Sequence, residues 1–182
     1  MAILVTGGAR SGKSSFAEKL CANYGDRGIY IATAQLYDDE MRERVHMHQM
    51  ERDQAAFEWK TIEEPYDLIA LLGDLEGSKM ILVDCLTLWL SNILLRCEAE
   101  PNATDLVKQQ IDQLVERVRI YAGTLIFVTN EVGSGIVPEY PLGRQYRDLA
   151  GYMNRKLAGV CEQVYLVTAG IPIELKSRAV QL

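Results

Sequence analysis

A glycine-rich stretch near the start of the chain reads Gly7, Gly8, Ala9, Arg10, Ser11, Gly12, Lys13 and Ser14. It matches G-x-x-x-x-G-K-[ST], the phosphate-binding P-loop pattern. The apolar run at residues 2–6 predicts a buried strand before it, and residues 15–20 predict a helix after it. A chance match would not require these flanks, whereas a P-loop needs them to aim backbone N–H groups at a polyphosphate. We therefore predict nucleoside triphosphate binding, with Lys13 at the β- and γ-phosphates and the Ser14 hydroxyl at Mg²⁺.

Alternating apolar runs and helical stretches predict the fold. Residues 29–33 form a second apolar run after the first helix, and strand, crossover helix and strand make a βαβ unit with parallel strands. Further buried strands are predicted at residues 80–84, 124–129 and 164–168, with a short antiparallel edge strand at 171–175. The expected fold is α/β, a P-loop NTPase-like three-layer arrangement in which helices cover both faces of a mostly parallel central sheet. We expect one domain spanning residues 1–182.

Composition and charge exclude several classes of protein. The 182 residues carry a formal net charge of −6, which argues against a nucleic-acid partner because nucleic-acid surfaces are basic. The longest apolar run, residues 85–95, is too short to span a bilayer, and the chain enters a strand without a signal peptide. Widely spaced cysteines predict reduced thiols and a cytoplasmic location. These cysteines are Cys21, Cys85, Cys97 and Cys161.

Polar residues at strand ends are the next candidates, because ligands bind at the carboxyl ends of parallel strands. Ala32, Thr33 and Ala34 follow the second strand and form either a wall of the nucleotide site or an ordinary loop. The apolar run at 80–84 ends in Asp84. This is the Walker B form, in which a strand delivers a carboxylate to Mg²⁺ beside the P-loop.

The end of the fourth strand, at residues 130–135, carries Asn130 and Glu131 followed by glycines. It predicts a mobile active-site loop, with a plain surface loop as the alternative. The guanine-reading N-K-x-D sequence of switch GTPases is absent there, so a small-molecule kinase or nucleotidyltransferase fits better. On the following helix, Arg144, Arg147 and Asp148 are placed either to clamp phosphates or to form ion pairs.

Three expectations concern the helices. Residues 86–95 are apolar on nearly all sides, so this helix is buried or lies at a subunit contact, and we favour the contact because the domain is small. Pro65 fits the first turn of a helix that runs to Leu72. Thr104 or Asp105 caps a long helix that ends near residue 121.

The chain has two histidines, His46 and His48, on a helix that opens with acidic residues. Two positions apart on a helix, they point to roughly opposite sides and make a poor joint metal site. His48 shares a face with Met41 and Val45, which is the face expected to contact protein. The spacing alone leaves His48 as either a packed structural residue or a chemical one.

A series of longer motifs is similar to one family. In chain order they are G-G-A-R-S-G-K-S at residues 7–14, A-T-A at 32–34, D-D-E-M-x-x-R-V-x-x-H at 38–48, W-K-T-I-E at 59–63, V-D-C-L-T-L-W-L-S-N at 83–92, T-N-E-V-G-S-G-I-V-P at 129–138, R-D-L-A-G-x-M-N at 147–154 and A-G-I-P at 169–172. Together they resemble the bifunctional adenosylcobinamide kinase/adenosylcobinamide-phosphate guanylyltransferase family of cobalamin biosynthesis. The resemblance runs essentially end to end.

The resemblance implies two reactions. ATP or GTP phosphorylates the aminopropanol hydroxyl of adenosylcobinamide, and GTP then gives GMP through an enzyme histidine to adenosylcobinamide phosphate, releasing pyrophosphate. The family histidine lies seven residues after the Met of D-D-E-M, which selects His48. The resemblance also implies a homotrimer and an Mg²⁺ held at Ser14 and Asp84. The implied GTP contacts beyond the P-loop are Ala32, Thr33, Ala34, Gln49, Met50, Glu51, Arg52, Glu63 and Asp84.

Two other functions fit part of the sequence. The P-loop and Asp84 alone fit a kinase of another small hydroxyl substrate, in which His48 is structural. The apolar stretch at 86–95 fits a non-catalytic nucleotide-binding or interaction module. Neither accounts for the full series of motifs.

Overall fold

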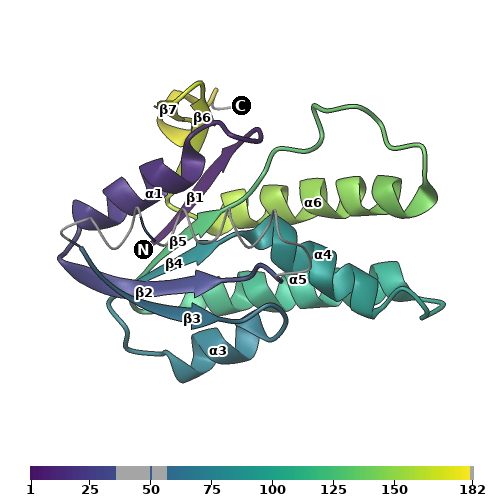
Figure 1. Ribbon diagram of the computed structural model, residues 1–182, viewed down its shortest axis with the longest axis horizontal. Coiled ribbons are helices and arrows are strands. Elements are labelled where there is room, and N and C mark those ends of the chain that lie inside the picture. The colour runs from purple at the N-terminus through teal and green to yellow at the C-terminus, as the bar shows by residue number, and fades with distance from the viewer. Residues whose placement is uncertain (36–49, 51–56, 181–182) are drawn as a thin grey trace.

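The computed structural model describes residues 1–35, 50 and 57–180. The helix expected after residue 37, and with it His46, His48, Gln49, Glu51 and Arg52, lies outside these residues. Element labels follow Figure 1. The strands are β1 (Ala2–Gly7), β2 (Arg27–Ala32), β3 (Glu58–Glu63), β4 (Met80–Asp84), β5 (Thr124–Val128), β6 (Gln163–Thr168) and β7 (Ile171–Glu174). The helices are α1 (Lys13–Ala22), α3 (Leu68–Asp74), α4 (Leu86–Arg96), α5 (Ala103–Ile120), α6 (Pro141–Val160) and the 3₁₀ helix η1 (Lys176–Arg178).

The described strands form one seven-stranded sheet in the order β3-β2-β4-β5-β1-β6-β7. All neighbouring pairs are parallel except β6 and β7, which run antiparallel at one edge. The prediction of a mostly parallel sheet with a short antiparallel edge strand is therefore confirmed. The order also places β5 between the P-loop strand β1 and the Asp84 strand β4, so the ends of all three meet at one edge.

Both faces of the central strands β1, β4 and β5 are buried, which explains why these strands read as continuous apolar runs. Ile3 and Val5 of β1 pack with Ala17 and Leu20 of α1 on one face. The alternate residue Leu4 joins the larger core on the other face, which α3, α4, α5 and α6 cover. The result is the expected three-layer arrangement, with α1 opposite the layer that contains α4, α5 and α6 (Figure 1).

Helix α4 corrects one expectation. Seven of its eleven residues are buried, and the helix packs against α5 and α6 of its own chain. The choice of a subunit contact for this helix was therefore wrong for most of its surface. A helix that is apolar all round fits burial in its own chain as well as a contact, and here two neighbouring helices supply the cover. Leu95, near its end, is 47% exposed.

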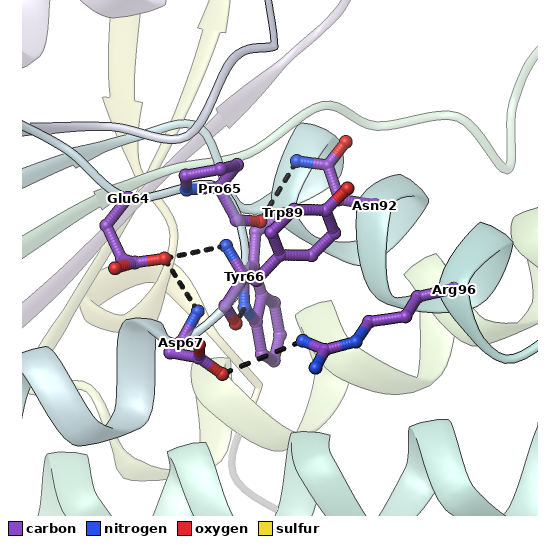
Figure 2. A network of polar contacts seen from close by, with 7 residues as sticks. All are labelled: Glu64, Pro65, Tyr66, Asp67, Trp89, Asn92 and Arg96. Atoms are coloured by element: carbon purple, nitrogen blue, oxygen red, sulfur yellow. Dashed lines mark hydrogen bonds and ion pairs between the residues drawn. The ribbon is translucent and has the colours of Figure 1, made fainter.

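Two helix starts also differ from expectation. α3 begins at Leu68 rather than at Pro65, because a turn precedes it. In this turn the Glu64 carboxylate accepts hydrogen bonds from the backbone N–H groups of Tyr66 and Asp67, at 2.9 and 2.8 Å (Figure 2). The N-cap of α5 is Asn102, one residue before the helix, so Thr104 and Asp105 belong to its first turn.

The turn before α3 is fastened to α4 by side chains that donate to its carbonyl groups. The Trp89 indole N–H donates to the Tyr66 carbonyl oxygen at 2.9 Å, and the Asn92 amide donates to the Pro65 carbonyl oxygen at 3.0 Å (Figure 2). This holds the segment after β3 at the carboxyl edge of the sheet. None of the helices in the described part of the chain has the length and apolar character needed to cross a bilayer.

Candidate active site

The P-loop begins at Gly7, the last residue of β1, and ends at Ser14, the second residue of α1. Gly7 is a steric requirement, because a Cβ there would lie 2.4 Å from the Val167 carbonyl oxygen and 2.6 Å from the Ser11 hydroxyl. Gly12 has φ of 90° and caps α1, a conformation that favours glycine. Gly7 is thus required because other atoms approach its backbone closely, and Gly12 because its backbone is left-handed.

Neighbouring segments hold the P-loop in place. The backbone N–H of Glu131 donates to the Gly7 carbonyl oxygen at 3.0 Å, and that of Gly170 donates to the Ser11 carbonyl oxygen at 2.9 Å. The Lys13 ammonium donates to the Gly8 carbonyl oxygen at 3.2 Å. The loops after β5 and β6 therefore both contact the P-loop, and Lys13 lies over it.

Asp84, the candidate Mg²⁺ ligand, lies at the end of β4 next to the buried Cys85. Asp84 is half-buried at the end of β4, and its Oδ2 accepts a hydrogen bond from the Tyr30 hydroxyl at 3.1 Å. The next residue is Cys85, whose pKa is raised to about 11 by burial and by the negative charge of Asp84, against smaller lowering effects that include the positive charge of Lys13. Val128 of β5 is the register partner of both Val5 of β1 and Asp84 of β4, so the carboxylate and the P-loop that follows β1 lie at the same edge of the sheet.

The second-strand candidates, Ala32, Thr33 and Ala34, lie beside this carboxylate. Thr33 is fully buried, and its hydroxyl donates to the Cys85 carbonyl oxygen at 2.7 Å while accepting from the Cys85 N–H at 2.9 Å. The Thr33 side chain therefore ties the end of β2 to the end of β4. Glu63 is exposed at the end of β3, directly opposite Ala32 in the strand register.

A polar network that the sequence analysis did not identify joins α4 and α6 to the segments that follow β4 and β5. The Asn130 amide donates to the Thr87 hydroxyl at 3.0 Å, and Thr87 in turn contacts the Cys85 sulfur at 3.1 Å. From α6, the Asn154 amide donates to the Asn130 carbonyl oxygen at 3.1 Å and accepts from the Thr129 hydroxyl at 2.7 Å. The available signal was an asparagine at a strand end, but its partners are distant in sequence.

The two arginines of α6 hold the loop that follows β5. The Arg147 guanidinium donates through Nη2 to the Gly133 carbonyl oxygen, and Arg144 donates through Nη1 to the Pro138 carbonyl oxygen at 3.2 Å and to that of Glu139. Glu131 accepts a hydrogen bond from the Gly133 N–H at 2.8 Å, so its carboxylate is turned towards its own loop. Neither arginine forms an ion pair within the described part of the chain.

Comparisons with known proteins agree with this geometry. The fold is similar to a prototypical ATPase from the type III secretion system of pathogenic bacteria, with a TM-score of 0.54 at 13% identity, over 99% of this chain and 58% of that one. This likeness shows the fold alone.

Relatives similar in sequence are more informative. The chain is 44% identical to the bifunctional adenosylcobalamin biosynthesis protein CobP of Pseudomonas aeruginosa, over 95% of this chain and 96% of that protein. It is 40% and 37% identical to the CobU proteins of Salmonella typhimurium and Escherichia coli, over 97% of this chain and their full length. Residues 3–175 match the family described as cobinamide kinase / cobinamide phosphate guanyltransferase. The resemblance seen in the motifs is confirmed, and the chain belongs to the cobinamide kinase / cobinamide phosphate guanyltransferase family.

Proposed function

We propose that the protein catalyses two successive reactions: phosphorylation of adenosylcobinamide by ATP or GTP, and transfer of GMP from GTP to adenosylcobinamide phosphate. The observation that carries this proposal is the position of the P-loop and Asp84 at one edge of the sheet, where Val5 of β1 and Asp84 of β4 share Val128 as register partner; a phosphate-transfer site needs a P-loop with a carboxylate beside it. Family membership supplies the identity of the acceptor. A homotrimer of single-domain cytoplasmic subunits is part of the same proposal and rests on the resemblance.

In this proposal the triphosphate binds along the P-loop, at Gly7, Gly8, Ala9, Arg10, Ser11, Gly12, Lys13 and Ser14. Loop N–H groups and the N-terminus of α1 contribute positive potential there. The rest of the nucleotide lies along the carboxyl edge, where Ala32 and Glu63 are neighbours in the register. The remaining contacts implied by the resemblance are Thr33, Ala34, Gln49, Met50, Glu51, Arg52 and Asp84.

Mg²⁺ fits the oxygen ligands at this edge. Asp84 offers a half-buried carboxylate and Ser14 a half-buried hydroxyl at the start of α1. Within the described residues no group of three or more histidine, cysteine or acidic side chains gathers as a metal cage. Magnesium commonly binds one or two protein oxygens together with substrate phosphates, so Asp84 and Ser14 suffice as its protein ligands. Bound there, the ion would neutralise charge on the phosphate oxygens.

The kinase step needs positioning more than covalent chemistry. The acceptor hydroxyl oxygen bonds to the γ-phosphorus, and the bond from that phosphorus to the bridging oxygen breaks. The electron pair stays on the nucleoside diphosphate, and the hydroxyl proton leaves. Lys13 stabilises the charge that develops on the phosphate oxygens, which is the main protein contribution in such reactions.

For the second reaction we propose His48 as the nucleophile. A neutral imidazole nitrogen bonds to the α-phosphorus of GTP, and the bond to the β-phosphate bridging oxygen breaks with release of pyrophosphate. A phosphate oxygen of the acceptor then bonds to the same phosphorus. The phosphorus–nitrogen bond breaks, and its electron pair returns to the imidazole.

Labelling with GTP tests this proposal. The protein is incubated with GTP labelled at the α-phosphate or, as a control, at the γ-phosphate, and run on a denaturing gel. We expect a band from the α-label only, lost in acid, stable in alkali, absent in His48→Ala and retained in His46→Ala. Kinase turnover should persist in His48→Ala. An active, nucleotide-bound protein that takes no label would instead be a kinase without the transferase step.

A further inference from the structure

Buried polar atoms without a hydrogen-bond partner gather at the carboxyl edge of the sheet. Within the described part of the chain they include Thr6 Oγ1, Ser11 Oγ, Asn130 Oδ1 and Arg147 Nε. Thr6 lies near the end of β1, Ser11 lies in the P-loop, and Asn130 follows β5. Buried polar atoms are nearly always paired, so a local group of exceptions indicates a site that a ligand completes.

Arg147 differs from the other three because it carries a full charge. Its side chain is half-buried, its Nη2 donates to the neutral Gly133 carbonyl oxygen, and its Nε is buried without an acceptor. No carboxylate pairs with it among the described residues. A partly buried guanidinium with unused N–H groups is costly unless an anion joins it, and a phosphate matches its fork of donors.

Helix α6 aims Arg147 at the active-site edge. Asn154, two turns further on and therefore on the same helical face, contacts Thr129 and Asn130 at the end of β5. Gly133, the partner of Arg147, lies two residues beyond Glu131, which contacts Gly7 of the P-loop. The guanidinium is thus linked to the P-loop through one short loop.

Arg147 and the P-loop reach this edge from opposite faces of the sheet. α1, which follows the P-loop, packs in the core on one face. α6 packs on the other face, through Leu149, Ala150, Met153 and Leu157. In the proposed function the triphosphate binds along the P-loop, which leads into α1, and this leaves the α6 side of the edge, with Arg147, to a different phosphate.

We propose that Arg147 binds the phosphate monoester of the acceptor in the guanylyl-transfer step. This inference rests on the proposed function. The acceptor is a neutral alcohol in the first reaction and carries a phosphate only in the second, so a cation outside the P-loop is needed in the second step alone. Held by Arg147, the acceptor oxygen is positioned to bond to the phosphorus of the guanylyl group as the phosphorus–nitrogen bond breaks.

The test separates acceptor binding from every earlier event. Guanylyl-enzyme is made from α-labelled GTP, freed of nucleotide, and mixed with a range of cobinamide phosphate concentrations. A parallel series uses pyrophosphate, which removes the label by reversal at the P-loop. We expect Arg147→Gln to raise the half-saturating concentration of cobinamide phosphate about ten- to a hundredfold, the effect of losing a charge-assisted hydrogen bond. Discharge by pyrophosphate should be unchanged.

Two further variants keep the test decisive. Arg147→Lys retains the charge but loses the planar fork, so it should show a smaller shift than Arg147→Gln. Arg155→Gln, which changes an exposed arginine on the same helix, should behave as wild type. An unchanged half-saturating concentration in Arg147→Gln, equal loss of both discharge reactions, or failure to take label would each overturn the inference. A wild-type protein that takes no label would instead overturn the proposed transferase step.

Discussion

The backbone N–H of Glu131 lies 3.0 Å from the carbonyl oxygen of Gly7 and donates a hydrogen bond to it. This single contact joins the loop after β5 to the first residue of the P-loop. It requires the two backbones to approach closely, and Gly7 permits this because a Cβ there would collide with Val167 and Ser11. The P-loop and the β5 loop are therefore one structural unit.

We predict that Gly7→Ala lowers the free energy of unfolding by about 1–3 kcal/mol, the usual range for overpacking. The added methyl group would lie 2.4 Å from the backbone oxygen of Val167, which cannot move aside as a side chain would. Gly8→Ala is the matched control, because a Cβ there meets nothing within 4 Å. Urea denaturation without nucleotide measures both, and equal stability of the two variants would contradict the steric argument.

We predict that Lys13→Met lowers the rate of γ-phosphate transfer at saturating substrate by about 100-fold or more, the typical effect of removing one charge-stabilising group. The fold should remain intact, because the Lys13 ammonium contacts only the Gly8 carbonyl oxygen among the hydrogen bonds of the described residues. Lys19→Met, exposed on the same helix, should keep wild-type turnover. Phosphate-transfer assays under identical conditions compare the two, and similar rates would remove Lys13 from the site.

The sequence predicted those parts of the fold that depend on local pattern. Short apolar runs separated by helical stretches predicted the parallel sheet, and the apolar run that ends in Asp84 predicted a strand whose end lies at the same edge as the P-loop. The burial of α4 was less predictable, because an apolar stretch such as residues 86–95 fits its own core and a subunit contact equally well. Whether this stretch is covered by its own chain or by another subunit depends on how α5 and α6 pack against it.

The sequence could not predict hydrogen bonds between residues that are far apart in the chain. Thr33 was expected at the nucleotide, yet its hydroxyl bonds twice to Cys85, 52 residues away. Arg147 was expected to clamp phosphate or form an ion pair, and it contacts the Gly133 carbonyl oxygen. Such partners depend on which strand and loop ends the fold brings together, and no local propensity encodes this.

Asn92 and Arg96, on the same helix, should differ sharply in their contribution to stability. The buried Asn92 amide donates to the carbonyl oxygens of Thr33 at 2.9 Å and Pro65 at 3.0 Å. Asn92→Ala leaves these carbonyls unpaired and should cost about 2–3 kcal/mol. Arg96→Ala breaks a 3.8 Å ion pair with Asp67 whose side chains are 62% and 73% exposed, and should cost at most about 1 kcal/mol. Denaturant midpoints test the order, and a larger loss in Arg96→Ala would reverse it.

The buried thiol of Cys161 should make the stability of the protein depend on alkaline pH. Burial raises the pKa of this thiol from 9.0 to about 12. Above pH 9 the unfolded chain releases this proton while the folded chain keeps it, so the stabilisation is complete below pH 9 and is lost as pH rises towards 12.

Cys161→Ala should therefore make the protein less sensitive to alkali. The slope that one such proton adds is at most about 1.4 kcal/mol per pH unit, so between about pH 8 and about pH 10.5 the variant should lose about 2 kcal/mol less than wild type. Leu157→Ala, a buried neighbour without a titrating group, should lower stability equally at both pH values. Urea unfolding at the two pH values measures all three proteins. An identical pH dependence of Cys161→Ala and wild type would show that the buried thiol does not govern alkaline stability.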